Sequence, residues 1–481
     1  MTSMRRFATP FLVALLAGCA AGPDYSRPPM TLPAGYKEAP DWKPAQPSDD
    51  HPRGAWWQVF ADGDLDALEA KIEVSNQTLR AAVASYEQAL ALAAQARAAL
   101  FPVVSANVSY TRARGSGGAA STVANTAGAQ LAASWEPDLF GRVRRGIEAN
   151  NAGAQASGAE LEATRLALQA QLAQDYFLLR VADAQIRLLD ETVDGYAKFL
   201  VLTRNRYAAG VVSRADVAAA ESQLASVQAQ RVDAQLGRAQ LEHAIAVLIG
   251  AVPADFALPA RTELPTAQRL PQIPALLPAQ LLERRPDIAA AERRAAAANA
   301  QIGVAQSAYF PTLSIAASGG WRGPSFSDLI SAPNRVWSLG PALAATLFDG
   351  GARRAATDAA RAGFEQTAAQ YRQTVLAALQ EVEDNLAALR ILDDEARLQR
   401  DAVRAARESL AQTTNQYKAG TVSYLNVITA QATLYTAQRT ELDVHGRQLS
   451  ANVALIRALG GGWIGLDVAR RDEQAAKRSA R

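Results

Sequence analysis

Two stretches decide how this chain folds: Tyr207-Ala-Ala-Gly-Val-Val-Ser213 and Tyr417-Lys-Ala-Gly-Thr-Val-Ser423, 210 residues apart. In each, a glycine closes a long segment without proline, and a serine precedes another helical pattern. Glycine relieves the strain of the left-handed residue that ends many helices, and serine is a preferred N-cap residue. Each stretch is therefore predicted to be a tight turn between a long helix and a returning helix capped by Ser213 or Ser423.

The two turns belong to a tandem repeat. Three further pairs keep nearly the same offset: Phe101-Pro102 with Phe310-Pro311, Phe140-Gly141 with Phe348-Asp-Gly350, and Leu248-Ile-Gly250 with Ala458-Leu-Gly460. Anchors that share one offset indicate that a structural unit occurs twice. We expect repeat one over residues 58–252 and repeat two over residues 287–462, joined by a proline-rich linker at 253–286.

Very long helices are predicted on both sides of the turns, because no proline lies between Pro137 and Pro253 or after Pro341. An apolar stripe with a seven-residue period runs through both repeats, which implies a coiled coil of helices wound about neighbours. The stripe is interpreted as a packed wall and not as a ligand site. At roughly 1.5 Å per residue, the long helices would each measure about 100 Å.

Each repeat is expected to hold three helices of unequal length. The long helices are predicted over about 142–209 and 352–419, the returning helices over 213–249 and 423–459, and preceding helices over 64–99 and 287–309. The combined length of the preceding and returning helices is close to that of the long helix in repeat one and less close in repeat two. The two shorter helices are therefore expected to stack end to end beside the long one.

Four segments with a two-residue period lie between the helices, at about 101–114, 128–138, 310–322 and 335–348. In the first, Val104, Ala106 and Val108 alternate with serine and asparagine. Alternating large apolar and small polar residues are typical of transmembrane β-barrel strands, although the strands of a soluble sheet can also alternate. The fold class predicted here is mainly α with a transmembrane β-barrel portion.

Four strands are too few to close a barrel, for which about eight is the practical minimum. An open sheet edge in lipid would leave backbone groups without hydrogen bonds. Other copies of the chain must therefore complete the barrel. Two copies would supply eight strands and three would supply twelve, and the periodicity does not choose between them.

The N-terminus has the pattern of a secretory signal. Arg5 and Arg6 precede a short apolar run that ends in Leu16-Ala-Gly-Cys19. This run is too short to span a bilayer, and no later segment approaches the roughly 20 apolar residues required. We expect a signal peptide at 1–18 and no transmembrane helix in the mature chain.

Cys19 is the single cysteine of the chain. The sequence around it resembles the bacterial lipobox, in which the cysteine thiol accepts a diacylglyceryl group; an ordinary Ala-x-Ala cleavage site is the alternative. Residues 19–57 would then form a lipidated, extended arm. In lipoproteins, a residue such as Ala20 after the cysteine, rather than aspartate, generally implies export to the outer membrane.

Composition argues against nucleic-acid binding and catalysis. The formal net charge is +2, from 49 Lys and Arg against 47 Asp and Glu, and there is no basic block. The sequence has no nucleotide-binding loop, no His-Glu-x-x-His and no pairing of nucleophile and base, so we expect no enzyme activity, metal or cofactor apart from the lipid. Arg284-Arg285 and the basic residues of a disordered tail at 463–481 are interpreted as solvated charges.

Several motifs together resemble one known family. They are Gly18-Cys-Ala-Ala-Gly-Pro-Asp-Tyr25, Trp56-Trp57, Trp135-Glu-Pro-Asp-Leu-Phe-Gly-Arg142, Arg285-Pro-Asp-Ile288 and the two Phe-Pro pairs. This combination is similar to the TolC-like outer membrane factors, and most similar to their lipoprotein branch, the NodT or OprM-like channels of RND efflux systems. The resemblance covers residues 11–463.

The resemblance implies a homotrimer whose twelve strands form an open barrel in the outer membrane of a Gram-negative bacterium. Its helices would form an α-barrel across the periplasm that docks to an adaptor (membrane fusion protein) and, through it, to an inner-membrane RND transporter. The implied function is the passive release of small molecules such as drugs. Two alternatives stay open: an exit duct for type I polypeptide secretion, and a periplasmic spacer or adaptor lipoprotein without a pore.

By the same resemblance, the two turns form a periplasmic tip that meets the adaptor and closes when idle. The expected adaptor contacts are Gly210, Val211, Val212, Gly420, Thr421 and Val422. The expected gate residues are Tyr207, Arg214, Asp216, Tyr417, Lys418, Asn426 and Thr429. Carboxylates are common in the family where Asn426 and Thr429 stand, so a neutral ring with a weaker electrostatic filter is expected. Arg214 and Asp216 are expected to form inter-helix ion pairs that hold the closed state.

Overall fold

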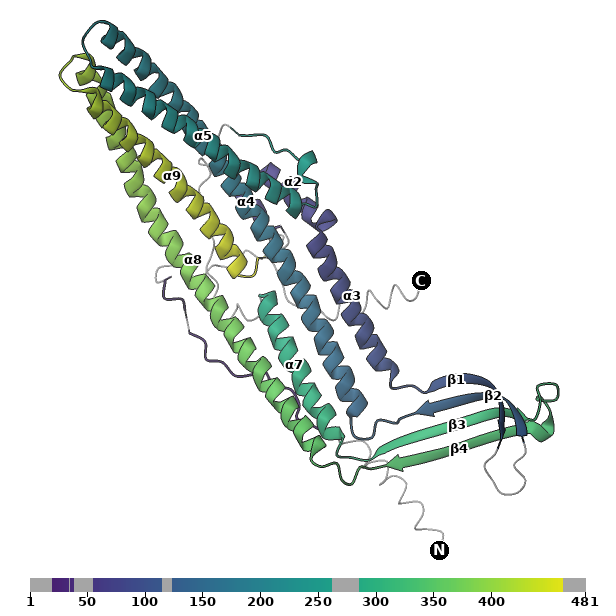
Figure 1. Cartoon of the computed structure of the whole chain (residues 1–481). Helices are drawn as coiled ribbons and strands as arrows, with labels where there is room; N and C mark the ends of the chain where they lie inside the picture. The colour runs from purple at the N-terminus through teal and green to yellow at the C-terminus, as the bar shows by residue number, and fades with distance from the viewer. Residues whose placement is uncertain (1–19, 34, 39–54, 115–122, 262–284, 462–481) are drawn as a thin grey trace. The chain divides into compact units, whose positions relative to one another are not determined.

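The computed structural model describes residues 20–33, 35–38, 55–114, 123–261 and 285–461 (Figure 1). In chain order the elements are η1 (Trp56–Phe60), α2 (Gly63–Ser75), α3 (Gln77–Ala98), β1 (Val103–Arg114), β2 (Val123–Trp135), α4 (Arg142–Ala208), α5 (Arg214–Leu248), η3 (Pro253–Asp255), α7 (Pro286–Ser307), β3 (Thr312–Gly323), η5 (Ala332–Asn334), β4 (Arg335–Ala344), α8 (Ala352–Lys418) and α9 (Tyr424–Ala458). The predicted signal peptide, Cys19 and the tail at 463–481 lie outside the described residues, as do residues 262–284 of the predicted linker. Within the described ranges, no helix is both long and apolar enough to cross a lipid bilayer.

The helices repeat in length as well as in order. The long helices α4 and α8 have 67 residues each, the returning helices α5 and α9 have 35 each, and α3 and α7 have 22 each. The single helix expected over 64–99 is wrong, because the chain turns extended at Asn76 and divides it into α2 and α3. The break makes α3 equal in length to α7.

Contacts divide the chain into two compact units that cut across the repeats. The unit here called the sheet unit comprises Met1–Met30, Ser85–Gly158 and Ala290–Gln373. The other, called the tip unit, comprises Thr31–Ala84, Ala159–Ala289 and Thr374–Arg481. Each unit therefore combines corresponding parts of both repeats.

The sheet unit contains a four-stranded antiparallel sheet in the order β1-β2-β3-β4 (Figure 1). The two strands of each repeat form a hairpin, and β2 pairs with β3 to join the hairpins. Gly320 permits this junction, because a Cβ atom there would lie 2.2 Å from the carbonyl oxygen of Ala129. Within one chain, β1 and β4 each keep an unpaired edge.

The register places the large apolar side chains of all four strands on one face. Val104 pairs with Ala133, Ala133 with Ala317, and Ala317 with Leu339. The adjacent row on the opposite face is polar or small, for example Ser105, Ala132, Ser318 and Ser338. All residues of β1 and β4 are exposed, so the described chain covers only part of the apolar face, near Ala127, which is buried, and Tyr110, on which Phe326 stacks.

The last strand is shorter than the segment predicted for it. β4 ends at Ala344, which pairs with Thr312, whereas the sequence suggested a strand to about residue 348. Pro311 precedes Thr312 and has no N–H to continue the ladder. Leu347 and Phe348 follow the strand with exposed apolar side chains.

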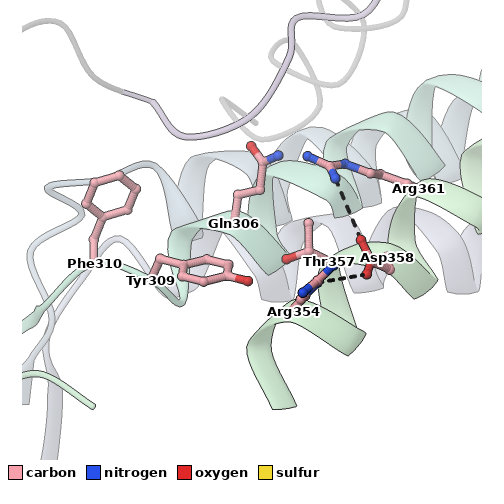
Figure 2. A pocket seen from close by; sticks show the side chains of 7 residues that line it. All are labelled: Gln306, Tyr309, Phe310, Arg354, Thr357, Asp358 and Arg361. Atoms are coloured by element: carbon pink, nitrogen blue, oxygen red, sulfur yellow. Dashed lines mark ion pairs between the residues drawn. The ribbon is translucent and has the colours of Figure 1, made fainter. Parts of the chain in front are cut away.

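A surface hollow lies where the sheet meets the helices of the sheet unit (Figure 2). Its volume is about 440 Å³. The C-terminal end of α7 and the residues that follow it form one side, and the first turns of α8 form the other. The lining residues are Gln306, Tyr309, Phe310, Arg354, Thr357, Asp358 and Arg361.

In the tip unit, a buried asparagine seals two helix ends at once. Asn76 accepts a hydrogen bond from the Leu79 N–H at 2.8 Å and donates one to the carbonyl oxygen of Leu248 at 2.7 Å. The first bond caps α3, and the second satisfies a carbonyl at the C-terminus of α5. Gly250 then passes so close to Ser75 that a Cβ atom would lie 2.2 Å from its carbonyl oxygen. The expected meeting of the preceding and returning helices is confirmed here.

Repeat two makes the corresponding junction with an arginine. Arg285 is buried, donates to the carbonyl oxygen of Ala458 at 3.1 Å, and forms ion pairs with Asp287 at 2.7 Å and Glu381 at 2.9 Å. Burial alone would lower the pKa of Arg285, but the two carboxylates raise it above its ordinary value. The interpretation of Arg285 as a solvated charge is therefore wrong, because it closes the C-terminal end of α9.

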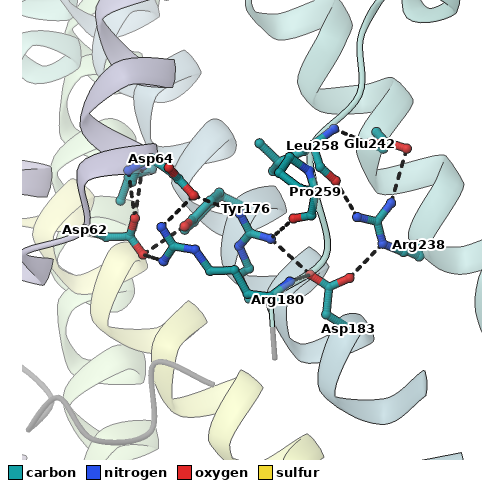
Figure 3. A network of polar contacts seen from close by, with 11 residues as sticks. Asp62, Asp64, Tyr176, Arg180, Asp183, Arg238, Glu242, Leu258 and Pro259 are labelled. Carbon is teal, nitrogen blue, oxygen red and sulfur yellow. Dashed lines mark hydrogen bonds and ion pairs between the residues drawn. The ribbon is translucent and has the colours of Figure 1, made fainter. Parts of the chain in front are cut away.

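A network of buried charges fixes residues 258–261 to the helices (Figure 3). The side chain of Arg180 is 1% exposed and donates to Asp183 at 3.0 Å and to the carbonyl oxygen of Pro259 at 2.9 Å. Asp183 also accepts from Arg238 of α5 at 2.7 Å. Removing one member would leave an uncompensated buried charge, which typically lowers the stability of the fold by about 3–5 kcal/mol. The start of the predicted linker is thus a packed part of the tip unit.

One carboxyl group in α2 is buried without a charge partner. Glu69 is 0% exposed, and neither carboxyl oxygen has a hydrogen-bond partner. Burial, with smaller contributions from Glu73 and Asp66, raises the pKa of Glu69 to about 9. Its carboxyl group is therefore protonated in the folded protein at neutral pH.

We predict that Glu69→Gln stabilises the fold at neutral and alkaline pH. The folded pKa lies above the unfolded value, so the stability present below about pH 4.5 is lost as the pH rises toward 9. The loss by pH 7 is on the order of 3 kcal/mol. In thermal unfolding scans, the wild-type midpoint should fall between pH 5 and 8.5 more steeply than that of the variant.

Glu73→Gln is the matched control, because Glu73 is partly exposed on the same helix and pairs with Arg165. It should flatten the pH profile only slightly, because burial and not the Glu73 charge is the main cause of the raised pKa of Glu69. Parallel profiles for wild type and Glu69→Gln would contradict the assignment of a neutral, buried carboxyl group.

Candidate functional site

The two turns chosen from the sequence end their helices in the same way. Gly210 has φ 71° and Gly420 has φ 76°. Val211 N–H bonds to the carbonyl oxygen of Arg206 at 2.9 Å, and Thr421 N–H bonds to that of Gln416 at 3.0 Å. These bonds, with those from each glycine N–H to the tyrosine three residues earlier, form a Schellman cap. Both glycines are therefore required by the backbone, whatever else the turns contact.

The two serines that follow the turns behave differently. The Ser213 side chain accepts from Asp216 N–H at 3.2 Å, and the Asp216 carboxylate accepts from Ser213 N–H at 2.9 Å, which makes a full capping box. Ser423 occupies the N-cap position, but its side chain makes no capping hydrogen bond. The cap expected from the Ser423 side chain is therefore wrong. The residue three positions later is Asn426 and not an acid.

An apolar cluster joins the two helical hairpins next to the turns. It contains Leu200 of α4, Val217 and Ala220 of α5, Tyr417 of α8, and Tyr424 and Val427 of α9. The Tyr417 and Tyr424 rings lie 5.6 Å apart between centroids. Burial, with contributions from the neighbouring tyrosines, raises the pKa of Tyr424 to about 12, so its hydroxyl group stays neutral. The cluster holds four helix ends in one bundle.

Arg206 links the hairpins through polar contacts as well, and the sequence analysis missed it. Its guanidinium carbon lies 4.6 Å from the centre of the Tyr417 ring, and its Nη1 donates to the Tyr417 carbonyl oxygen at 2.7 Å. This combines a cation–π contact with a satisfied carbonyl at the end of α8. A residue-by-residue comparison of the repeats could have found it, because repeat two has Gln416 at the equivalent position.

The equivalent tyrosines of the two repeats have different surroundings. Tyr417 is 1% exposed, and its hydroxyl group has no hydrogen-bond partner. Tyr207 is 45% exposed. Of the two tyrosines predicted as gate residues, the structure places Tyr417 inside the bundle and Tyr207 on the surface.

The remaining predicted gate residues are not brought together within the chain. Lys418, Asn426 and Thr429 are exposed, and the Thr429 hydroxyl donates to the carbonyl oxygen of Leu425 in its own helix. Arg214 lies 3.9 Å from Glu221, also in its own helix, while Asp216 serves the capping box. The described chain thus forms no inter-helix ion pair with Arg214 or Asp216. Near the turns, Arg204 of α4 instead pairs with Glu221 of α5 at 2.8 Å.

The residues predicted to contact an adaptor lie at the surface of the turns. Val211 is an exposed apolar side chain, and Val212 and Val422 are half-buried. The Thr421 hydroxyl donates to the carbonyl oxygen of Gln416. An exposed valine beside a rigid cap is a surface on which another protein can dock.

In the sheet unit, the start of the described chain is fixed at the base of the sheet, which is the end where the strands continue into the helices. Ala21 N–H donates to the carbonyl oxygen of Phe140 at 2.9 Å. The buried Arg145 donates to the carbonyl oxygens of Ala21 and Gly22 and pairs with Asp24 at 2.8 Å. Gly22 has φ 94°, and a Cβ atom there would lie 2.4 Å from the Cα of Gly303. The chain is therefore held two residues after Cys19.

The described residues contain no cluster of His, Cys, Asp and Glu suited to a metal ion. His445 is half-buried, its Nε2 has no partner, and burial lowers its pKa, so it stays neutral at neutral pH.

Comparisons with known proteins agree on one family. A sequence profile described as "outer membrane efflux protein" matches residues 70–251 and 277–461. The chain is 33% identical over 459 residues to the probable efflux pump outer membrane protein TtgC of Pseudomonas putida, covering 93% of this chain and 94% of that protein. It is 29% identical over 463 residues to the cation efflux system protein CusC of Escherichia coli, covering 94% of this chain and 98% of that one. The solved structure of the outer-membrane channel OprN has a TM-score of 0.84 and 30% identity, covering 92% of this chain and 100% of that one.

We predict that Arg206→Ala loosens the contact between the two hairpins. A partly buried cation–π contact is worth about 1–2 kcal/mol, so amide exchange at the helix ends near Tyr417 should accelerate by about 5- to 30-fold. Hydrogen–deuterium exchange with mass spectrometry measures this change. Arg206→Lys should recover part of the protection, because it keeps the charge but loses the planar stack.

Arg214→Ala is the control, because Arg214 is an exposed arginine eight residues away with one distant ion pair. It should leave exchange near Tyr417 unchanged. Equal acceleration in both variants, or none in Arg206→Ala, would show that the Arg206 contact does not hold the hairpins together.

Proposed function

The chain belongs to the outer membrane efflux protein family, and we propose that three copies form the outer membrane exit duct of a tripartite RND-type efflux system. In this role the protein conducts small molecules passively and carries out no chemistry. The observation that supports the proposal most directly is the strand register, which gathers the apolar side chains on one face and leaves both sheet edges unpaired. Such a sheet suits a barrel wall with lipid outside and water inside.

The edges support assembly with other copies. In lipid, each unpaired N–H or C=O group of β1 and β4 costs several kcal/mol. The β4 edge of one copy can pair with the β1 edge of the next until the ring closes. Four strands per chain fit eight or twelve strands, and the family resemblance favours twelve, from three copies.

The tip supports docking of an adaptor protein. The two capped turns present Val211 and Thr421 on a rigid frame held by the apolar cluster. In the proposed complex, an adaptor contacts residues 210–212 and 420–422, and an RND transporter of the inner membrane supplies the cargo. Asn426 and Thr429 are exposed near the second turn, so a pore ring built from them would be neutral and discriminate weakly between cations and anions.

The N-terminal arm supports lipidation of Cys19. The hydrogen bond from Ala21 to Phe140 holds residue 21, two positions after Cys19, at the end of the sheet that continues into the helices. In the proposed assembly, the base of the sheet lies at the periplasmic surface of the outer membrane. An acyl chain on Cys19 could enter the bilayer there, and the barrel supplies the second membrane element that a single lipid anchor needs.

We predict that Leu339→Arg blocks membrane insertion and that Ser338→Arg does not. These neighbours in β4 point to the apolar and the polar face respectively. Arginine on the lipid face near the middle of the bilayer costs about 2–4 kcal/mol per chain. In planar-bilayer recordings, wild type and Ser338→Arg should form channels, with altered conductance for Ser338→Arg, whereas Leu339→Arg should form few.

Equal channel formation by both arginine variants would contradict a lipid-facing apolar surface. A wild type without channels, even after Arg206→Ala, would favour the spacer or adaptor lipoprotein. Native mass spectrometry of the same samples should give three chains per complex, and two chains would correct the proposed assembly.

A deletion strain separates the two kinds of cargo. We expect the strain to become more susceptible to small toxic compounds, and the plasmid-borne gene to restore resistance. Polypeptide secretion into the medium should stay unchanged. The reverse pattern, with retained secreted polypeptides and unchanged susceptibility, would assign the duct to type I secretion.

A further inference from the structure

We propose that the surface hollow at the start of α8 binds the phosphate-bearing headgroup of an anionic phospholipid from the periplasmic leaflet of the outer membrane. The proposal rests on the membrane location proposed above. It is carried by the position of the hollow, its charge and its contact with the N-terminal arm.

The hollow lies where the membrane surface would be. Tyr309 and Phe310 line it, and Phe310 is two residues before the first residue of β3. The Phe310 ring stacks on Phe140 with 4.8 Å between centroids, and Phe140 follows the end of β2. Aromatic side chains at the ends of transmembrane strands lie at the level of the lipid headgroups. The first turns of α8 therefore start just below that level.

The charges of the hollow favour an anion. Arg354 and Arg361 share a single carboxylate, Asp358, at 3.9 Å and 3.7 Å (Figure 2). The two arginine side chains are 86% and 60% exposed, so these long ion pairs contribute little. Two cations and one anion leave a net positive charge beside Gln306 and Tyr309, which can add neutral hydrogen bonds. Arginine binds phosphate oxygens with two parallel hydrogen bonds, and exposed arginines can turn to do so.

The N-terminal arm shows which side of the wall the hollow faces. Gly22 packs against Gly303 of α7, and the Gln306 Oε1 lies 3.7 Å from the position that a Cβ atom on Gly22 would take. The hollow thus borders the arm three residues after Cys19. If Cys19 is acylated as proposed above, the acyl chain enters the bilayer on the side of Gly22, and the hollow opens toward lipid headgroups and not into the duct.

Two similar pairs on α8 provide an internal comparison. Arg397 pairs with Asp394, and Arg404 pairs with Asp401, with the same spacing as Arg361 and Asp358. They belong to the tip unit and lie more than 30 residues further along the helix. A charge effect confined to the membrane surface should not involve them.

The test measures retained lipid. Wild type, Arg354→Ala/Arg361→Ala and Arg397→Ala/Arg404→Ala are reconstituted in nanodiscs of phosphatidylcholine with phosphatidylglycerol, extracted into detergent and analysed by native mass spectrometry. We expect about one phosphatidylglycerol per chain in the wild type and in Arg397→Ala/Arg404→Ala. Each arginine near an anionic surface contributes about fivefold, so Arg354→Ala/Arg361→Ala should weaken retention by about 25-fold. Arg354→Lys/Arg361→Lys, which keeps the charge, should restore a large part of it.

Three results would overturn the proposal. Equal loss of lipid from both double alanine variants would show a general charge effect. Displacement of phosphatidylglycerol by millimolar inorganic phosphate would show a site for free phosphate instead. Loss of oligomer in Arg354→Ala/Arg361→Ala alone would show that a neighbouring copy of the chain occupies the hollow.

Channel recordings on the same samples separate this proposal from the proposed function. A wild type that conducts but retains no phosphatidylglycerol overturns the lipid site and leaves the duct in place. A wild type that retains phosphatidylglycerol but forms no channels supports the site and overturns the duct.

Discussion

Backbone hydrogen bonding in lipid is the constraint on which the rest of this structure depends. A four-stranded sheet with a largely uncovered apolar face is unstable in water, and its unpaired edges are costly in a membrane. The register between β2 and β3 matters most here, because it aligns the alternation of both repeats on one face. A slip of one residue would turn one hairpin's apolar side chains to the opposite face. The two hairpins therefore share one apolar face only if β2 and β3 pair in this register. Gly320 allows the backbones to approach at that junction.

In the tip unit, the backbone N–H and C=O groups at helix ends likewise need hydrogen-bond partners. Each α-helix leaves four N–H and four C=O groups without intrahelical partners, and stacked helices bury some of them. Repeat one meets this demand with Asn76, a neutral side chain that both donates and accepts. Repeat two uses Arg285, which can only donate and therefore needs Asp287 and Glu381 for its charge. Two sequences thus reach similar junctions by different chemistry.

Much of this could be predicted from periodicity and spacing. The bounds of α4, α5, α8 and α9 follow from the glycine turns and the absence of proline, and the two-residue period located the strands. The break at Asn76 was missed, because asparagine inside a helical pattern signals a break only when a partner such as the Leu248 carbonyl is in place. Arg285 and Arg206 were missed for the same reason. Each acts on a residue more than 170 positions away, and a local pattern carries no such information.

At the tip, equivalent residues of the two repeats have different contacts. Both turns have the same cap, yet Tyr417 is enclosed and Tyr207 is exposed. Tyr417 is enclosed by the apolar cluster and by Arg206, which reaches from the first hairpin to the second, whereas Gln416 in repeat two lacks the charge for a reciprocal contact. Within a chain, this contact therefore reaches from the first hairpin to the second and not in the reverse direction. The face of the first hairpin that bears Tyr207 is left for other contacts. If a ring of copies closes and opens at this end, the hairpins need not move equally. The second hairpin would be restrained by its own chain and the first by whatever lies beyond it.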